Sequence, residues 1–156
     1  MVNYKVVGCG DKNKYTDPQA YRDTINYIAN PQKAQFVGAF GVSSITTAAE
    51  EMQAAAVGFG KDKGKRVRHS VMSFSEDEAV TADEVFEYAK RCAEFYADRF
   101  QIAFAVHGNT DNAHAHFVMN MTSYVDGRRY DGSHKDYNAF LKHIERVTGR
   151  PVISVK

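Results

Sequence analysis

Two neighbouring segments with alternating large and small side chains place the strongest limit on the fold. In residues 101–107 and 114–124, bulky apolar side chains occupy every second position, with small or polar side chains between them. Successive side chains of a β-strand point to opposite faces, so each segment predicts a strand with one apolar face. The short polar stretch 108–112 joins the two strands, which predicts an antiparallel hairpin.

The rest of the chain predicts single strands separated by helices. We expect strands at 3–7, 35–42, 66–74 and 151–155, and helices at 17–29, 47–58, 81–100 and 133–149. This order predicts one sheet with helices packed on it. We therefore expect an α+β fold, with a mainly antiparallel central sheet and flanking helices, as a single domain over residues 1–156.

The composition is that of an ordinary globular protein. Hydrophobic residues make up 44% and charged residues 25%, which excludes wholesale disorder, and a net charge of +1 means that any basic surface is local. The longest stretch without a charged side chain, residues 34–49, is interrupted by Gly, Ser and Thr, so we expect no transmembrane helix. The N-terminus has no long apolar core, and two cysteines are too few for a disulfide framework. We expect a cytoplasmic protein without a membrane partner.

Three of the six histidines, His107, His114 and His116, lie in the predicted hairpin. Alternation places His114 and His116 on one face, about 7 Å apart at Cα, and His107 on the small-residue face of the preceding strand. If the bulky faces meet the helices, the three imidazoles converge on the open side of the sheet. Three neutral imidazoles can hold a metal ion and leave coordination positions open, as catalytic sites do. Asn120 shares the face and could hold a water or a substrate oxygen. The alternative is three unrelated surface histidines.

Tyr27, near the end of the first predicted helix, is a candidate nucleophile. A tyrosine hydroxyl attacks poorly at neutral pH, but a divalent cation that polarises a phosphoryl oxygen makes the attack competent. The chain has nine tyrosines, so an ordinary helix tyrosine is the alternative.

The charges are unevenly distributed along the chain. Residues 61–68 (KDKGKRVR) carry five bases and one acid, whereas residues 76–87 carry six acids and no base. Two solvated surfaces would explain this pattern. A phosphate-facing loop, with its counter-charge on a helix that faces away, is the functional interpretation.

Together these residues resemble the MobA/MobL-type mobilization relaxases, a family within the HUH (His-hydrophobic-His) endonucleases. The similarity runs from about residue 25 to residue 155 and rests on three motifs in order. The motifs are Tyr27-Ile28-Ala29-Asn30 with Lys33, then RHSVMSF ending in Ser73-Phe74, then His107, Asn109, His114, His116 and Asn120. The resemblance implies the palm-like sheet of that superfamily.

The resemblance also implies a DNA nicking and rejoining enzyme for plasmid or mobile-element mobilization. The three histidines would hold a divalent ion at the scissile phosphate of single-stranded DNA, and Tyr27 would attack to leave a free 3′-hydroxyl and a 5′-phosphotyrosine. Family members use Mg²⁺ or Mn²⁺, whereas an all-imidazole site intrinsically favours Zn²⁺ or Ni²⁺. The implied partners are single-stranded DNA at a transfer origin and accessory mobilization proteins.

Ser73 is expected to contact the DNA near the cleavage point, and Asn120 is assigned to the DNA-binding residues as well. Basic side chains are expected to neutralise DNA phosphates, and we assign this role to Lys33, Lys61, Lys63, Lys65, Arg66 and Arg68. One position departs from the family pattern, because Asn109 replaces the acid that follows the first histidine. Asn109 can orient a partner by hydrogen bonding but cannot take a proton at neutral pH, and Asp111 is the candidate substitute for the acid.

Other functions fit parts of the pattern. A replication initiator or transposase of the same superfamily would use a tyrosine after the histidines. Tyr137 occupies such a place, although Lys142 follows it by five residues rather than four. A single-stranded DNA-binding module without catalysis would explain Asn109. A small-molecule metallohydrolase would explain neither the segment around Tyr27 nor the basic stretch.

Overall fold

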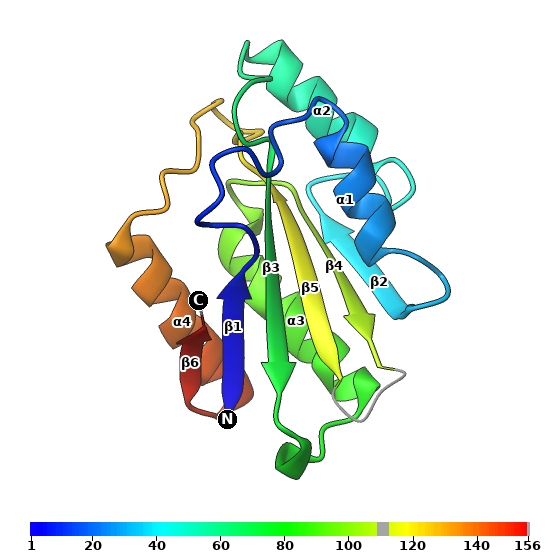
Figure 1. The fold of residues 1–156 in the computed structure, drawn as a ribbon, viewed down its shortest axis with the longest axis vertical. Coiled ribbons are helices and arrows are strands. Elements are labelled where there is room, and N and C mark those ends of the chain that lie inside the picture. The colour runs from blue at the N-terminus through cyan, green and yellow to red at the C-terminus, as the bar shows by residue number, and fades with distance from the viewer. Residues whose placement is uncertain (109–112, 156) are drawn as a thin grey trace.

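The structure, a computed structural model, describes residues 1–108 and 113–155. Its helices and strands follow the order predicted from the sequence (Figure 1). They are β1 (Val2–Val6), α1 (Ala20–Ile28), β2 (Ala34–Phe40), α2 (Ala48–Gly58), β3 (Val67–Phe74), the 3₁₀ turn η1 (Glu76–Glu78), α3 (Ala82–Ala97), β4 (Ile102–His107), β5 (His114–Asn120), α4 (His134–Thr148) and β6 (Val152–Val155). Within the described ranges, no helix has the length and apolarity needed to cross a membrane.

The strands form one six-stranded sheet in the order β2-β4-β5-β3-β1-β6. Neighbouring strands are antiparallel except β1 and β6, which run parallel. The predicted hairpin is the β4–β5 pair near the centre of the sheet, in which His107 pairs with His114. The expected α+β fold, with a mainly antiparallel sheet and flanking helices, is confirmed.

Helices cover both faces of the sheet. α3 and α4 pack on the face that carries the bulky side chains of β4 and β5, where Phe104 and Phe117 enter the larger core. α1 and α2 pack on the other face, over Ala103, Ala105 and Val118 (Figure 1). We predicted that this second face would be open, and that prediction is wrong, because its small side chains leave room for two helices to bury part of it.

Local sequence signals determine several helix ends. The Thr81 hydroxyl accepts a hydrogen bond from the backbone N–H of Glu84 and caps α3, and Ser133 caps α4 by accepting from Asp136. α4 ends at Gly149, whose φ of +66° favours glycine. These positions agree with the helix starts and stops expected from the sequence.

Candidate active site

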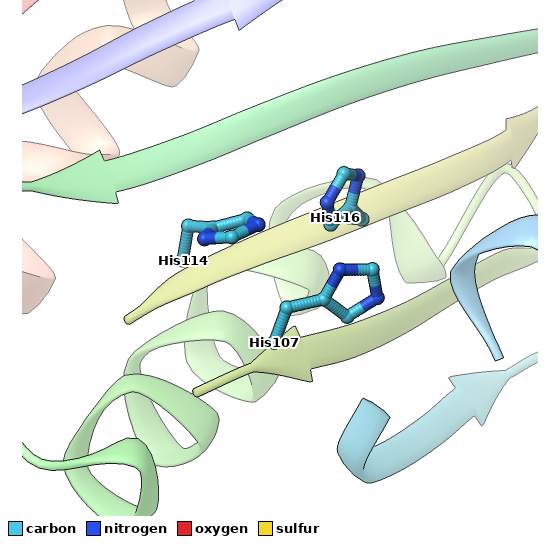
Figure 2. A group of neighbouring side chains, drawn as sticks. All are labelled: His107, His114 and His116. Atoms are coloured by element: carbon cyan, nitrogen blue, oxygen red, sulfur yellow. The ribbon is translucent and has the colours of Figure 1, made fainter. Parts of the chain in front are cut away.

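Three histidine side chains meet where β4 ends and β5 begins (Figure 2). His107 and His114 are direct cross-strand partners, and His116 lies opposite Ala105 on the same face of the sheet. Each histidine offers one ring nitrogen, and these three nitrogens lie within 4.8 Å of one another. His107 and His116 are buried, and His114 is partly exposed. The predicted convergence of the three imidazoles is confirmed, and the group could hold a metal ion.

Hydrogen bonds assign one nitrogen of each buried ring to the protein. His107 donates from Nε2 to the backbone carbonyl oxygen of Ile28 (2.9 Å), which leaves the lone pair on Nδ1. Nδ1 of His116 lies 2.8 Å from Nε2 of His69, so Nε2 is the His116 nitrogen that can face an ion. Outer hydrogen bonds of this kind hold metal-binding histidines in place, so the cluster fits a metal ion.

Burial keeps these imidazoles neutral. It is the largest influence that lowers the pKa of His116, and the nearby His107 and His69 lower that pKa further. Burial, followed by the charge of Lys14, lowers the pKa of His69 to about 4. Burial also lowers the pKa of His107, against the opposing effect of its hydrogen bond to the backbone. Metal ions bind the neutral form of histidine, so protons compete weakly for His107 and His116 at neutral pH.

Tyr27 projects from the last turn of α1 beside the histidines. It is 51% exposed, and its ring centroid lies 5.9 Å from those of both His69 and His116. The chain turns at Asn30, whose carbonyl oxygen accepts a hydrogen bond from the backbone N–H of Lys33. This turn brings Nζ of Lys33 to 5.5 Å from the centroid of the Tyr27 ring. An exposed tyrosine, a lysine ammonium and a candidate metal centre therefore lie together.

A cavity of about 760 Å³ opens beside Tyr27 and is lined by residues of α1, β1 and β3. Ser73, one of the predicted DNA contacts, lines it and pairs with His114 across the sheet. Lys5 and Lys14 line it as well, and the sequence analysis missed both. The sequence predicts the strand that contains Lys5, but only the order of strands in the sheet shows that this strand, β1, is the neighbour of β3. The cavity therefore places two lysines and hydrogen-bond donors next to the candidate nucleophile, and the carboxylates of Asp17 and Asp23 line it as well.

The lysines of the basic stretch 61–68 do not line this cavity. The stretch leads into the start of β3, whereas Ser73 lies near the end of that strand. Nζ of Lys61 donates to the carbonyl oxygen of Gly127, and Nζ of Lys65 donates to that of Gly8, both at 2.9 Å. Lys63 is exposed on the same stretch. These lysines therefore lie away from the cavity beside Tyr27, and their phosphate contacts stay a prediction.

The two arginines of the stretch are also used within the fold. Arg66 forms a 2.9 Å ion pair with Asp62, and its side chain is mostly buried. Arg68 packs against the rings of Tyr96 and Tyr130, with its guanidinium carbon 4.9 Å from the centroid of Tyr130. Both arginines therefore have partners within the protein, and their contacts with DNA phosphates stay a prediction.

Asn120 is fully buried. Its side-chain amide donates to the carbonyl oxygen of Met52 and to Oε1 of Gln101, and its oxygen accepts from the backbone N–H of Thr122. The predicted DNA contact of Asn120 is wrong, because every polar atom of its side chain is occupied beneath α2. Asn120 instead ties the end of β5 to the helix above it.

Three other residues were singled out from the sequence. Asn109 and Asp111 fall outside the described residues. Tyr137 lies on α4, which packs on the face of the sheet opposite to the histidines. Its hydroxyl oxygen is 2.6 Å from Oγ of Ser154. This position does not support a reaction that combines Tyr137 with the histidine cluster.

Comparisons with known proteins point to one family. A family model for relaxases, described as the MobA/VirD2-like nuclease domain, matches residues 27–149. A solved structure from work on the molecular basis of vancomycin resistance transfer in Staphylococcus aureus aligns with a TM-score of 0.58. The two chains are 13% identical, and the alignment covers 80% of this chain and 77% of that one, so this likeness supports the fold alone. No curated protein sequence matches the chain significantly. The range matched by the family model contains Tyr27, Ser73 and the three histidines.

Proposed function

Because the chain belongs to the relaxase family, as a MobA/VirD2-like nuclease domain, we propose that it nicks and rejoins single-stranded DNA through Tyr27. The observation that carries this proposal is the position of Tyr27, which is exposed on α1 with its ring edge-on to His116. A nucleophile next to a candidate metal centre is the arrangement that phosphoryl transfer to a protein side chain requires.

The proposed reaction conserves the energy of the phosphodiester bond. The hydroxyl oxygen of Tyr27 bonds to phosphorus as the bond between phosphorus and the 3′-oxygen breaks. The phenolic proton leaves to a base or solvent, and the departing 3′-oxygen takes up a proton to become a free 3′-hydroxyl. The product is a 5′-phosphotyrosine, which a 3′-hydroxyl can attack in the reverse reaction to rejoin the strand.

The histidine cluster is proposed to hold the metal ion. His107, His114 and His116 would be its ligands, with Mg²⁺ or Mn²⁺ expected from the family and Zn²⁺ or Ni²⁺ favoured by three imidazoles. A bound divalent ion polarises a phosphoryl oxygen and stabilises the charge that develops on it. Lys33 adds a positive charge beside Tyr27, where it attracts the phosphate.

The DNA strand is proposed to enter the cavity beside Tyr27. Lys5 and Lys14 would neutralise phosphates there, and Ser73 would donate a hydrogen bond near the cleavage point. The substrate would be the transfer origin of a plasmid or mobile element in the cytoplasm, with accessory mobilization proteins as further partners. β1 and β6 lie outside the matched range but complete the sheet, which supports a single relaxase domain over residues 1–156.

Cleavage of a labelled single-stranded oligonucleotide library that includes a candidate transfer-origin strand tests the proposal. In Mn²⁺ we expect a nicked product with a free 3′-hydroxyl, and we expect chelation or Tyr27→Phe to abolish it. Tyr137→Phe is the matched control and should cleave like the wild type. Salt-sensitive binding without cleavage in any metal would instead identify a DNA-binding module. Loss of cleavage only in Tyr137→Phe would identify Tyr137, on α4, as the nucleophile.

A further inference from the structure

A buried chain of hydrogen bonds runs from the histidine cluster to the loop before α1. Nδ1 of His116 lies 2.8 Å from Nε2 of His69, and Nδ1 of His69 lies 2.9 Å from the hydroxyl oxygen of Tyr15. We propose that His69 is a positioning residue of the metal centre, which holds His116 so that its Nε2 faces the ion. This inference rests on the metal role proposed above and adds His69 and Tyr15 to the site.

One arrangement of protons lets His116 bind an ion through Nε2. That nitrogen must offer its lone pair, so the proton of the neutral ring lies on Nδ1 and is donated to His69. His69 accepts this bond at Nε2, so its own proton lies on Nδ1 and is donated to the Tyr15 hydroxyl oxygen. Each ring then carries one proton, and each hydrogen bond has one donor. These two hydrogen bonds together therefore set the tautomers of both histidines.

Burial and strand register hold the two rings in place. His69 is 5% exposed and His116 is 6% exposed. On paired strands β3 and β5, Val71 lies opposite His116 and His69 lies opposite Val118, so the two histidines are diagonal neighbours. Their ring centroids are 5.1 Å apart and their planes differ by 30°, as expected for a nearly in-plane N–H···N bond. A side chain held this way can determine the direction of its partner.

The loop behind His69 is held in a conformation that tyrosine rarely adopts. Tyr15 has a φ of +66°, in the left-handed region, and such strain persists only where the surroundings enforce it. The backbone N–H of Arg66 donates to the carbonyl oxygen of Tyr15 (2.9 Å), and the Arg66 guanidinium donates to the carbonyl oxygen of Thr16 and to Asp62. Arg66, which the sequence predicted to bind DNA, thus supports the position of Tyr15.

Ion affinity of the full chain, measured by titration calorimetry with Zn²⁺ and with Mn²⁺, tests this role. His69→Leu removes the acceptor for His116 and should weaken the affinity by about 10- to 100-fold. His69→Gln keeps an acceptor oxygen and should stay within about threefold of the wild type. Tyr15→Phe keeps the ring but removes the hydroxyl that accepts from His69, so it should weaken the ion affinity less than His69→Leu does.

Nitrogen-15 NMR of the imidazoles gives a second readout, independent of cleavage. In the Zn²⁺-loaded wild type, His116 and His69 should both be protonated at Nδ1. A proton on Nε2 of His69 would overturn the inference. If His69→Leu does not fold, this NMR measurement on the wild type tests the inference by itself. If His69→Leu binds the ion as tightly as the wild type while His114→Ala binds it more weakly, the positioning role is overturned and the proposed function is left intact. A wild-type chain that binds neither ion would overturn both.

Discussion

The Nε2 N–H of His107 donates a 2.9 Å hydrogen bond to the carbonyl oxygen of Ile28, the residue that follows Tyr27. This bond ties the end of β4 to the last turn of α1. The elements that carry the candidate metal centre and the candidate nucleophile are therefore joined by a direct hydrogen bond, although they are far apart in the sequence. Preorganisation of this kind lowers the barrier to a reaction whose groups must already be in place.

Removing one imidazole should remove most of the stabilisation that an ion confers. An ion at a hundred times its Kd stabilises a protein by about 2.7 kcal/mol, which for a chain of this size raises Tm by roughly 5–10 °C. His114→Ala should lose most of this increase, because a ligand is missing from the cluster. Calorimetric scans with and without Mn²⁺ or Zn²⁺ measure the change. His134→Ala, an exposed histidine outside the site, should keep the full increase, and equal increases in both variants would contradict the assignment.

Charge removal inside the cavity should weaken DNA binding more than charge removal in the basic stretch. Lys14→Gln takes away a charge that lines the cavity, so the slope of log affinity against log salt should fall by about 0.7. Lys63→Gln removes the same charge from the exposed part of residues 61–68 and should leave the slope unchanged. Fluorescence anisotropy with a single-stranded oligonucleotide at several salt concentrations compares the two. A larger effect for Lys63→Gln would contradict binding in the cavity and would indicate that the DNA binds the basic stretch.

Asn120→Ala should destabilise the fold. The substitution leaves the carbonyl oxygen of Met52 and the backbone N–H of Thr122 without their buried partner. We expect a loss of about 2–3 kcal/mol in the free energy of unfolding, measured by urea titration. Asn138→Ala, on the exposed side of α4, should change that free energy by less than about 0.5 kcal/mol. If Asn120→Ala were as stable as the wild type and had lost DNA affinity, Asn120 would be a contact after all.

The metal-free protein should lose stability as the pH falls. Burial and the charge of Lys14 lower the pKa of His69 to about 4 in the folded state, with His107 as a further contributor, whereas an unfolded histidine titrates near 6.5. Between these values the unfolded chain binds more protons, so unfolding becomes easier as the pH drops. For His69 alone we expect a loss of about 2 kcal/mol between pH 7.5 and pH 5. Urea titrations at the two pH values measure it, and stability that is constant or rises on acidification would contradict the buried, neutral state.

Strand periodicity was enough to predict how the histidines meet. The alternation in residues 101–107 and 114–124 places His107, His114 and His116 on one face, provided that the bulky faces of both strands meet the same helices, as they do in the structure. Spacing alone could not place Tyr27 beside them. That proximity depends on how α1 crosses the sheet, and only the resemblance to the relaxases predicted it.

Partners that are distant in the sequence account for the contacts that the sequence could not predict. The run of bases at residues 61–68 gives no sign that Gly127 and Gly8 supply carbonyl oxygens for Lys61 and Lys65. Lys5 and His69 gained their places at the site from the strand order, which puts β1 next to β3 and β3 next to β5. Composition and periodicity carry no information about that order.

The attachment site of DNA on the protein tests the central claim most directly. Wild-type protein is incubated with a labelled transfer-origin strand and Mn²⁺, denatured and digested, and the DNA-linked peptide is identified by mass spectrometry. We expect a 5′-phosphate linked to Tyr27, in a peptide that is absent from the Tyr27→Phe variant. A covalent adduct at Tyr137 or any other residue, or DNA cleaved without an adduct, would contradict it.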